Sequence, residues 1–490
     1  MMRNLLLSIS IVLCTSAGLY AQTFSDALRY SYLTPFGTAR SVGAGGTLGS
    51  LGADFSSIYS NPAGLGWYRQ SEFTLSPMFG VANIKSQLYN GDGNPPNKEN
   101  DTRFNLANFG LVVAGRPRNP KWSTSNFALG FNRLADFNRE YTYRGSSRGT
   151  ILDRFVEQAN SQGLVPGESE VAYNAEALIY DEQAGEYYSD FDGLPDAVVE
   201  REQTIVASGS VSELSLAFAG NYDEKVLWGL TIGIPFLNYS EQKTYRESDP
   251  GTGQDGNIPY FDGLQWQENL TTTGAGINAK LGIIVRPSQM VRVGFAIHTP
   301  TLFGLEDNYS TAMFYDYTYQ GAALTGTDQS DNGLFNYRLH TPWRFLGGAG
   351  FIFGKIGFIS GEIEYLNYSN AKFRYDDQYD QSEGAVNEDI KSYLSSAVNF
   401  RLGGEVALDV WRARAGVAIL EAPLEGDQTI AKQFSAGFGG RFDGFYFDLA
   451  YRYSDSKESY IPYVTNAGPE QIVDLDFNYH RFVATLGFRF

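Results

Sequence analysis

Residues 474–490 read DLDFNYHRFVATLGFRF, and from Arg481 onward polar and apolar side chains largely alternate. One face of an extended strand here carries Phe482, Ala484, Leu486, Phe488 and Phe490, and the other carries Arg481, Thr485 and Arg489. Since successive side chains of a strand point to opposite faces, this stretch predicts a strand with one apolar and one polar face. Lipid outside a polar barrel interior explains this pattern, and so does a soluble sheet with its apolar face inward.

Segments of the same kind recur from about residue 70 to the end, each bounded by turn residues. We count about fourteen of them: 70–88, 102–115, 122–144, 207–221, 225–243, 270–285, 290–303, 334–353, 355–374, 392–408, 411–420, 432–442, 444–454 and 474–490. An even number of this size is typical of a single-chain outer-membrane barrel.

The connections between these segments alternate in length along the whole chain. Short turns such as Gly354-Lys355 and Asp443-Gly444 alternate with long polar stretches, of which 145–206 is the longest. Transmembrane barrels have short periplasmic turns at one end and longer extracellular loops at the other. A soluble sandwich or propeller has no reason to keep one end short, so the pattern favours the membrane.

The first segment predicts export. Residues 1–21 contain one basic residue, Arg3, then an apolar run from Leu5 to Leu13 and small residues up to Ala21, which is typical of a secretory signal peptide. The only cysteine, Cys14, lies inside it. We therefore expect a mature chain without a disulfide framework, a cysteine nucleophile or a cysteine-ligated metal.

Composition excludes several other classes of protein. The net charge of −18 disfavours nucleic-acid binding, which needs a basic face, and 34 Phe, 32 Tyr and 6 Trp disfavour disorder. No uninterrupted apolar run of about 18 residues follows the first segment, so the chain does not cross a membrane as helices. Only a closed β-barrel satisfies every backbone group in lipid without helices.

Both signs of charge fall on the faces expected to line the barrel interior. Candidate polar residues of the lumen are Arg292, His298, Arg344, Arg401, Glu405 and Arg414, and Arg452, Arg481, Glu362, Glu364 and Asp448 share these faces. We expect the charges to pair across strands and stiffen the wall.

A search for catalytic and metal sites finds no convincing pattern. The three histidines, His298, His340 and His480, have no metal-ligand spacing, so we expect no metal site. Residues 145–149, GSSRG, match a nucleophile motif, but they lie in a polar loop without the strand and helix that the motif needs. We expect no enzyme activity and no cofactor.

One motif lies before the first predicted strand. Residues 57–65, SIYSNPAGL, follow Gly43-Ala44-Gly45-Gly46, and the whole resembles the N-terminal signature of the FadL-type outer-membrane transporters of long-chain fatty acids and other hydrophobic compounds. Residues 287–300, 341–345, 400–405 and 414–416 resemble later strands of that family in order.

The resemblance implies an all-β, fourteen-stranded transmembrane barrel over residues 69–490, with residues 22–68 as an N-terminal hatch inside the lumen. Asn61, Pro62, Ala63 and Gly64 would belong to the hatch, either in contact with ligand or as a plain turn that seals the barrel. It further implies passive uptake of hydrophobic small molecules in the outer membrane of a Gram-negative bacterium. The expected partners are a hydrophobic ligand, outer-membrane lipid and the barrel assembly machinery, which would recognise the strand ending at Phe490.

The segment 145–206 departs from the family pattern, because its acidic composition differs from that expected of an apolar groove that captures ligand. A short amphipathic helix is nevertheless predicted there around Leu152 and Ala159, and Phe155, Tyr180, Tyr187 and Phe191 could line the ligand's way in. The long acidic loops leave a second hypothesis open, that the barrel serves a protein secretion system as a docking or shuttle component.

Overall fold

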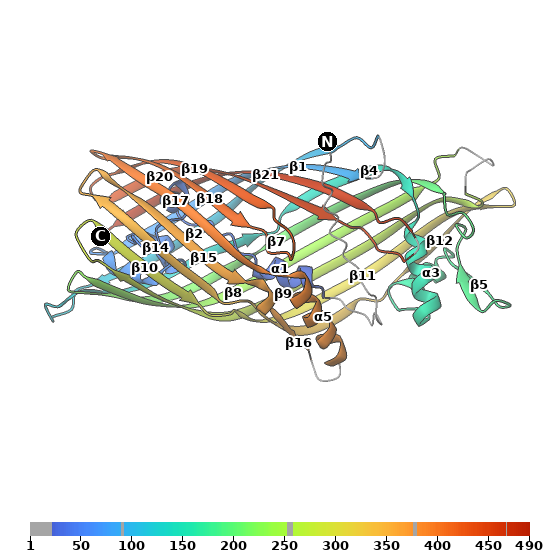
Figure 1. Cartoon of the computed structure of the whole chain (residues 1–490), viewed down its shortest axis with the longest axis horizontal. Coiled ribbons are helices and arrows are strands. Elements are labelled where there is room, and N and C mark those ends of the chain that lie inside the picture. The colour runs from blue at the N-terminus through green and yellow to red at the C-terminus, as the bar shows by residue number, and fades with distance from the viewer. Residues whose placement is uncertain (1–21, 90–92, 252–257, 376–379, 467) are drawn as a thin grey trace.

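The computed structural model describes residues 22–89, 93–251, 258–375, 380–466 and 468–490, so the expected signal peptide at 1–21 lies outside the described residues. Within them the chain forms a closed antiparallel β-barrel with fourteen positions around its wall (Figure 1). The barrel closes where β1 (Glu72–Tyr89) pairs with β21 (Ile472–Arg489). This confirms the predicted barrel and its number of strands.

Ten wall positions are single strands: β1, β2 (Asn97–Gly115), β7 (Val198–Tyr222), β8 (Val226–Ser248), β9 (Phe261–Val285), β17 (Ser396–Leu408), β18 (Trp411–Glu421), β19 (Ile430–Arg441), β20 (Phe445–Tyr460) and β21. The other four are broken into two pieces each: β3 (Trp122–Asp136) and β4 (Arg139–Arg148), β10 (Val291–His298) and β11 (Leu302–Tyr319), β13 (Gly333–His340) and β14 (Arg344–Phe353), β15 (Gly357–Asn367) and β16 (Lys372–Arg374). Pro300 and Pro342 lie in two of the breaks, where a missing N–H removes a ladder hydrogen bond.

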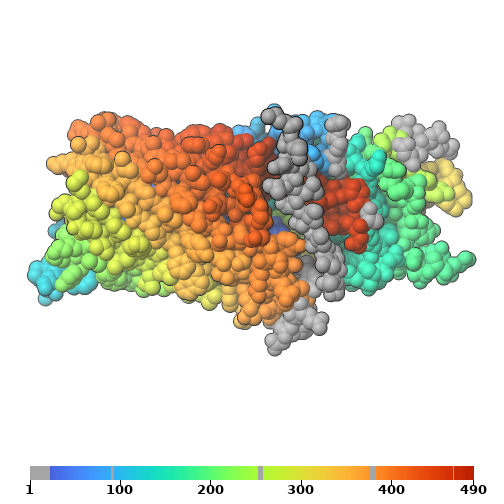
Figure 2. Space-filling model, viewed as in Figure 1, coloured from blue at the N-terminus to red at the C-terminus, as the bar shows by residue number. Residues whose placement is uncertain are grey.

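The two ends of the barrel differ as the connections predict, with tight turns at one end and long excursions at the other (Figure 1). The excursions include α3 (Ile151–Gln162), α4 (Ser169–Asn174), the hairpin of β5 (Ile179–Asp181) and β6 (Glu186–Tyr188), and α5 (Asp380–Tyr393). Figure 2 shows the region around α3, in teal, at one end of the elongated surface. Helix α3 confirms the amphipathic helix expected there.

The long connection predicted between the segments 290–303 and 334–353 is wrong in detail. Residues 304–333 are mostly strand, because β11 runs to Tyr319 and β12 (Ala322–Gln329) folds back on it. The strand continues beyond the stretch in which apolar and polar residues alternate. Because its side chains there are mostly polar, the alternation pattern does not detect it.

The outer face of the wall is apolar around the barrel. In β21 Phe482, Leu486 and Phe488 are 44–49% exposed, while Val483 and Thr485 between them are buried on the inner face. So many exposed large apolar side chains would be unfavourable in water, and they fit the hydrocarbon of a membrane. No helix among the described residues is long and apolar enough to span a membrane.

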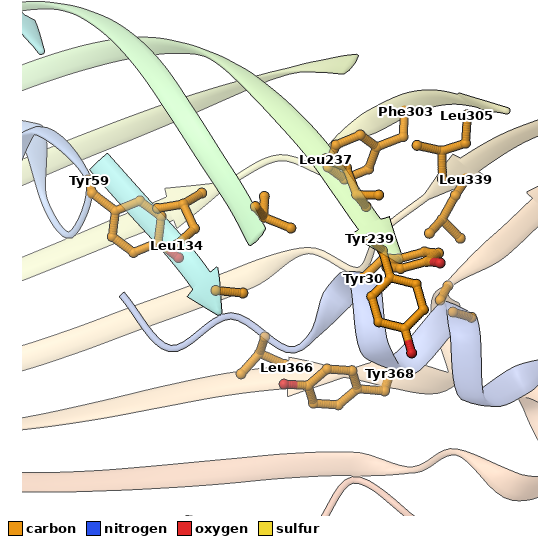
Figure 3. Packing of buried hydrophobic residues seen from close by; sticks show 14 of the residues in the cluster. Tyr30, Tyr59, Leu134, Leu237, Tyr239, Phe303, Leu305, Leu339, Leu366 and Tyr368 are labelled. Carbon is orange, nitrogen blue, oxygen red and sulfur yellow. The ribbon is translucent and has the colours of Figure 1, made fainter. Parts of the chain in front are cut away.

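Residues 24–68 lie against the inner face of the wall, and we call them the N-terminal segment. They contain α1 (Phe24–Ser31), α2 (Ala39–Gly43) and the 3₁₀ turns η1 (Phe55–Ile58) and η2 (Pro62–Trp67). Figure 3 shows Tyr30 and Tyr59 of this segment packed among wall residues such as Leu237, Leu339 and Leu366. The core of the molecule is therefore made between this segment and the wall.

Candidate functional site

Asn61 holds the centre of the N-terminal segment in place. It caps η2, because its Oδ1 accepts a hydrogen bond from the Ala63 N–H at 3.1 Å, and Pro62 takes the first position of that turn. Its Nδ2 donates to the Gly49 carbonyl at 2.7 Å and lies 3.3–3.4 Å from the Phe295 and Ile283 carbonyls of the wall. Asn61 thus links two turns of the segment to β9 and β10.

The four predicted hatch residues Asn61, Pro62, Ala63 and Gly64 are all buried against the wall and its neighbouring turn. Gly52 is in the left-handed region at φ +68°, and a Cβ there would overlap Gly64. The motif therefore needs its small residues for close packing. Its contact with ligand stays a prediction.

Glycines of the wall face the N-terminal segment around most of the barrel. A Cβ at Gly229 would overlap the Pro62 backbone, and one at Gly282 would overlap Asn61 Oδ1. We call the following nine residues the glycine girdle: Gly110, Gly130, Gly229, Gly282, Gly294, Gly350, Gly403, Gly416 and Gly437. Sequence reasoning missed it, although glycine inside a strand signals close approach of another backbone.

Polar side chains of the wall bind backbone groups of the segment. Arg344 Nη2 donates to the Ser31 carbonyl at 2.7 Å, Arg292 Nη1 to the Leu51 carbonyl at 2.6 Å and Thr231 Oγ1 to the Ile58 carbonyl at 2.8 Å. Glu362 Oε2 accepts from the Gly49 N–H at 3.2 Å. Irregular backbone inside a barrel needs such partners, because many of its N–H and C=O groups have no hydrogen bond within a helix or sheet.

The candidate lumen charges Arg344, Arg401, Glu405 and Arg414 form ion pairs as expected. Arg344 and Arg401 both bind Glu364, at 3.0 Å and 2.6 Å. Arg414 binds Glu405 and Asp448, each at 2.6 Å, and Arg40 of the N-terminal segment lies 3.3 Å from Glu405. The pairs therefore stiffen the wall and also hold the segment.

Three interior arginines do not follow the expected pairing. Arg292 binds the Leu51 carbonyl and has no ion pair among the described residues. Arg452 and Arg481 lie opposite each other on β20 and β21, and neither has an ion pair among the described residues. Sequence reasoning wrongly grouped them with the paired charges. The order of the strands does not show which residue lies opposite which, so it does not show where two side chains of like charge meet.

His298 is buried and contacts the N-terminal segment. Its Nε2 lies 3.1 Å from the Ser60 carbonyl, and its ring meets Tyr59 edge-on at 5.5 Å. The Ser60 hydroxyl donates elsewhere, to the Ser56 carbonyl. In the part of the chain that is described, no three His, Cys, Asp or Glu residues lie together as a metal site would need.

Residues 145–206 and the neighbouring loops form a structure over one end of the barrel, which we call the cap. The four residues predicted to line the ligand's entry lie in this cap. Phe155 and Phe191 are buried, and they pack on Trp266 and Phe261 at 4.8 and 4.9 Å between ring centroids. Tyr180 is 43% exposed and lies 4.8 Å from Tyr187 on the β5–β6 hairpin. Phe155 and Phe191 belong to a packed cluster, half-buried Tyr187 packs against that cluster, and Tyr180 lies on the surface. The structure therefore does not gather the four at one opening.

The cap is tied to the barrel by a fully buried ion pair that sequence reasoning missed. Arg201 Nη1 lies 3.7 Å from Glu247 Oε1, and Arg201 also donates to Tyr463 and to the Gly149 carbonyl. Glu247 in turn accepts from the Ile151 N–H at 3.1 Å, at the start of α3. Burial raises the pKa of Asp153 in the same helix to about 6.

A hollow of about 560 Å³ lies against the wall beside Pro77. Exposed Phe79, Phe104 and Phe482 rim it, and small residues such as Ala484 lie between them. Pro77 sits at a bulge of β1, where its pairing with β2 shifts register. The proline inside a predicted strand was the signal for this local defect.

No family model matches the chain, and no curated protein matches it. Solved structures do. A FadL homologue from Pseudomonas aeruginosa aligns with a TM-score of 0.56 at 15% identity, over 94% of this chain and 99% of that one. The chain has the FadL-type barrel fold.

Two further structures with the FadL-type fold align over similar lengths. The toluene transporter TodX of Pseudomonas putida gives a TM-score of 0.53 at 11% identity, over 94% of this chain and 100% of that one. The toluene transporter TbuX of Ralstonia pickettii gives 0.52 at 14%, over 93% and 98%. The fold that the sequence resemblance implied is confirmed.

Proposed function

We propose that this chain is an outer-membrane channel for the passive uptake of hydrophobic small molecules, with the N-terminal segment as its hatch. The proposal rests on the position of that segment inside a FadL-type barrel, where it packs on the glycine girdle and is bound by wall arginines. The solved structures of this fold include transporters of toluene, a neutral hydrophobic compound. Long-chain fatty acids are the second class of ligand that we expect.

The apolar outer belt and the two unlike ends support the membrane location. The tight-turn end would face the periplasm and the cap would face outward. We expect a molecule that arrives at the cap to need a shift of the segment in order to pass, since that segment packs against wall strands on many sides.

The lack of any cysteine outside residues 1–21 allows a direct test of this shift. Thr47 Oγ1 of the segment and Ser360 Oγ of β15 are 2.7 Å apart, so the pair Thr47→Cys and Ser360→Cys can form a disulfide between hatch and wall. As a matched control, Thr142→Cys and Thr204→Cys join two wall strands, whose hydroxyls are 3.0 Å apart.

We expect proteoliposomes with the hatch lock to lose uptake of radiolabelled toluene and dodecanol on oxidation and to regain it on reduction. The wall lock should have no effect. Uptake that persists with the hatch fully cross-linked would refute movement of the segment, and absence of uptake by the unmodified protein would refute the channel itself.

A further inference from the structure

Basic residues gather at one side of the tight-turn end of the barrel, where the turns β2–β3, β7–β8 and β9–β10 meet. The Asp223 N–H donates to the Lys121 carbonyl at 2.7 Å, and the Arg286 N–H donates to the Lys225 carbonyl at 2.8 Å, so the three turns are direct neighbours. We call the following six residues the basic patch: Arg69, Arg116, Arg118, Lys121, Lys225 and Arg286.

The patch is positive in a chain whose net charge is −18. The two carboxylates of its turns are both paired, Asp223 with Lys225 at 2.8 Å and Glu224 with Arg69. Six basic residues against these two acidic ones leave a net charge of +4. In the cap, by contrast, residues 149–197 contain eleven acidic residues and one basic residue. The basic patch and this part of the cap therefore carry opposite charge.

The turn between β2 and β3 presents the cations that have no partner. It has six residues and reaches past the neighbouring turns (Figure 1). Pro117 and Pro120 fix the backbone angle φ at two of its positions, so the turn is stiff. Arg116, Arg118 and Lys121 are exposed, and none of them has an ion pair within the described residues. These three side chains are available to an anion.

Aromatic side chains cover the outer face of the wall directly beside these turns. Trp122 follows the β2–β3 turn, Tyr222 precedes the β7–β8 turn, and their rings meet edge-on at 5.4 Å between centroids. A Cβ added to Gly220 would lie 2.9 Å from Trp122 and 2.6 Å from Nε1 of Trp228, so both indoles cover this glycine. We call Trp122, Tyr222 and Trp228 the aromatic cluster. Tyr222 and Trp228 are 38% and 43% exposed, and Trp and Tyr in such a position mark the level of the lipid head groups.

The basic patch and the aromatic cluster together fit an anionic lipid. Lys and Arg residues beside a membrane-spanning wall attract anionic head groups, and each one strengthens binding about fivefold. Guanidiniums give two parallel hydrogen bonds to a phosphate, and the indole N–H and phenol O–H groups add donors at the boundary between water and lipid. An acidic soluble protein would be attracted by the same charges, but it would not contact rings on the lipid-facing wall.

We propose that the basic patch and the aromatic cluster bind the phosphate head groups of anionic phospholipids in the membrane leaflet at the tight-turn end. This rests on the membrane location in the proposed function, which makes that leaflet the periplasmic one. It goes beyond transport, because the patch recognises a component of the membrane and not a transported molecule. The bound phosphates fix the depth at which this side of the wall lies in the membrane.

The test compares two lipids that differ only in the head group, anionic palmitoyl-oleoyl phosphatidylglycerol and zwitterionic palmitoyl-oleoyl phosphatidylcholine. Each is titrated into the purified full-length chain in neutral detergent, and native mass spectrometry measures the bound lipid. The unmodified protein should bind phosphatidylglycerol at least about tenfold more tightly, and Arg116→Gln with Arg118→Gln should reduce that preference by about tenfold or more. Lys355→Gln with Arg412→Gln is the matched control, because both residues lie at the same end outside the patch and the charge changes equally.

Two further measurements separate charge and lipid from other causes. Arg116→Lys with Arg118→Lys keeps the charge and should keep most of the preference. An equal concentration of glycerol 3-phosphate should leave phosphatidylglycerol bound; displacement would show that the patch holds free phosphate and would overturn the lipid site. Equal binding of the two lipids by the unmodified protein, or the same preference in the Gln variant as in its control, would also overturn it.

Uptake of toluene by proteoliposomes, measured in parallel, distinguishes this inference from the proposed channel. If uptake occurs without any preference for phosphatidylglycerol, the channel stands and the lipid site fails. If the preference is present without uptake, the lipid site stands and the channel fails.

Discussion

Asn61 donates from its side-chain amide to the carbonyl of Gly49 at 2.7 Å, and this bond joins two turns of the N-terminal segment that are twelve residues apart. The same amide lies within 3.4 Å of two wall carbonyls, and its oxygen caps the following turn. One side chain therefore connects the segment to itself and to the barrel.

Asn61→Ala should loosen the N-terminal segment without opening the barrel. It removes a cap and leaves buried carbonyls without donors, which together cost about 2 kcal/mol. Hydrogen exchange in residues 49–66 should accelerate by about tenfold or more, while exchange in β9 and β10 stays slow. Ser60→Ala, which removes one long hydroxyl contact next to it, should behave like the unmodified protein; equal protection of both variants would contradict this role of Asn61.

Gly282→Ala should displace the same segment from the wall side. The new methyl group overlaps Asn61 Oδ1, and overpacking of this kind costs about 1–3 kcal/mol. We expect a lower thermal midpoint and faster proteolysis within residues 49–66. Gly304→Ala is the matched control, since a Cβ at Gly304 meets nothing within 4 Å. Similar midpoints for the two variants would show that the girdle does not limit packing.

Removing one partner of the buried pair Arg201–Glu247 should unfold the cap while the barrel survives. Glu247→Gln leaves a buried guanidinium without its counter-charge, and such losses cost about 3–5 kcal/mol. Limited proteolysis should then cut within 145–206, while the heat-dependent shift of the barrel in gel electrophoresis is retained. Glu202→Gln removes the carboxylate of an exposed pair with Arg246 and should cost less than about 1 kcal/mol. Cutting in both variants alike would exclude the buried pair as the tie.

The stability of α3 should fall as pH rises. Because the pKa of Asp153 is raised to about 6 by burial, its neutral form favours the folded helix; the stabilisation is complete below pH 4 and is lost as pH rises through 6. After allowance for partial exposure to solvent, we expect the opening free energy of α3 to be about 1–2 kcal/mol larger at pH 4.5 than at pH 7.5. Hydrogen exchange corrected for intrinsic rates measures it. Asp153→Asn should remove the pH dependence, and Asp181→Asn on the exposed hairpin should keep it.

The wall was predictable from sequence because lipid outside and polar groups inside impose alternation, as from Arg481 to Phe490. The continuation of β11 past residue 304 was not, because Glu306, Asp307 and Asn308 there show no alternation of apolar and polar character. The glycines of the girdle are visible in the sequence, but the segment that each one accommodates lies up to hundreds of residues away. For Asn61 the motif predicted a hatch residue, and only the structure shows its three roles.

The wall of the barrel is much taller on one side. Strand β8 has 23 residues and β18 has 11, a difference of about 40 Å along the strand and, at the usual tilt, about 30 Å along the barrel axis. With the short side level with the lipid head groups, the tall side stands about that far above them and carries α3 at its top. Large particles that approach the cell, such as antibodies or phage tails, would therefore touch the α3 region before they reach the membrane.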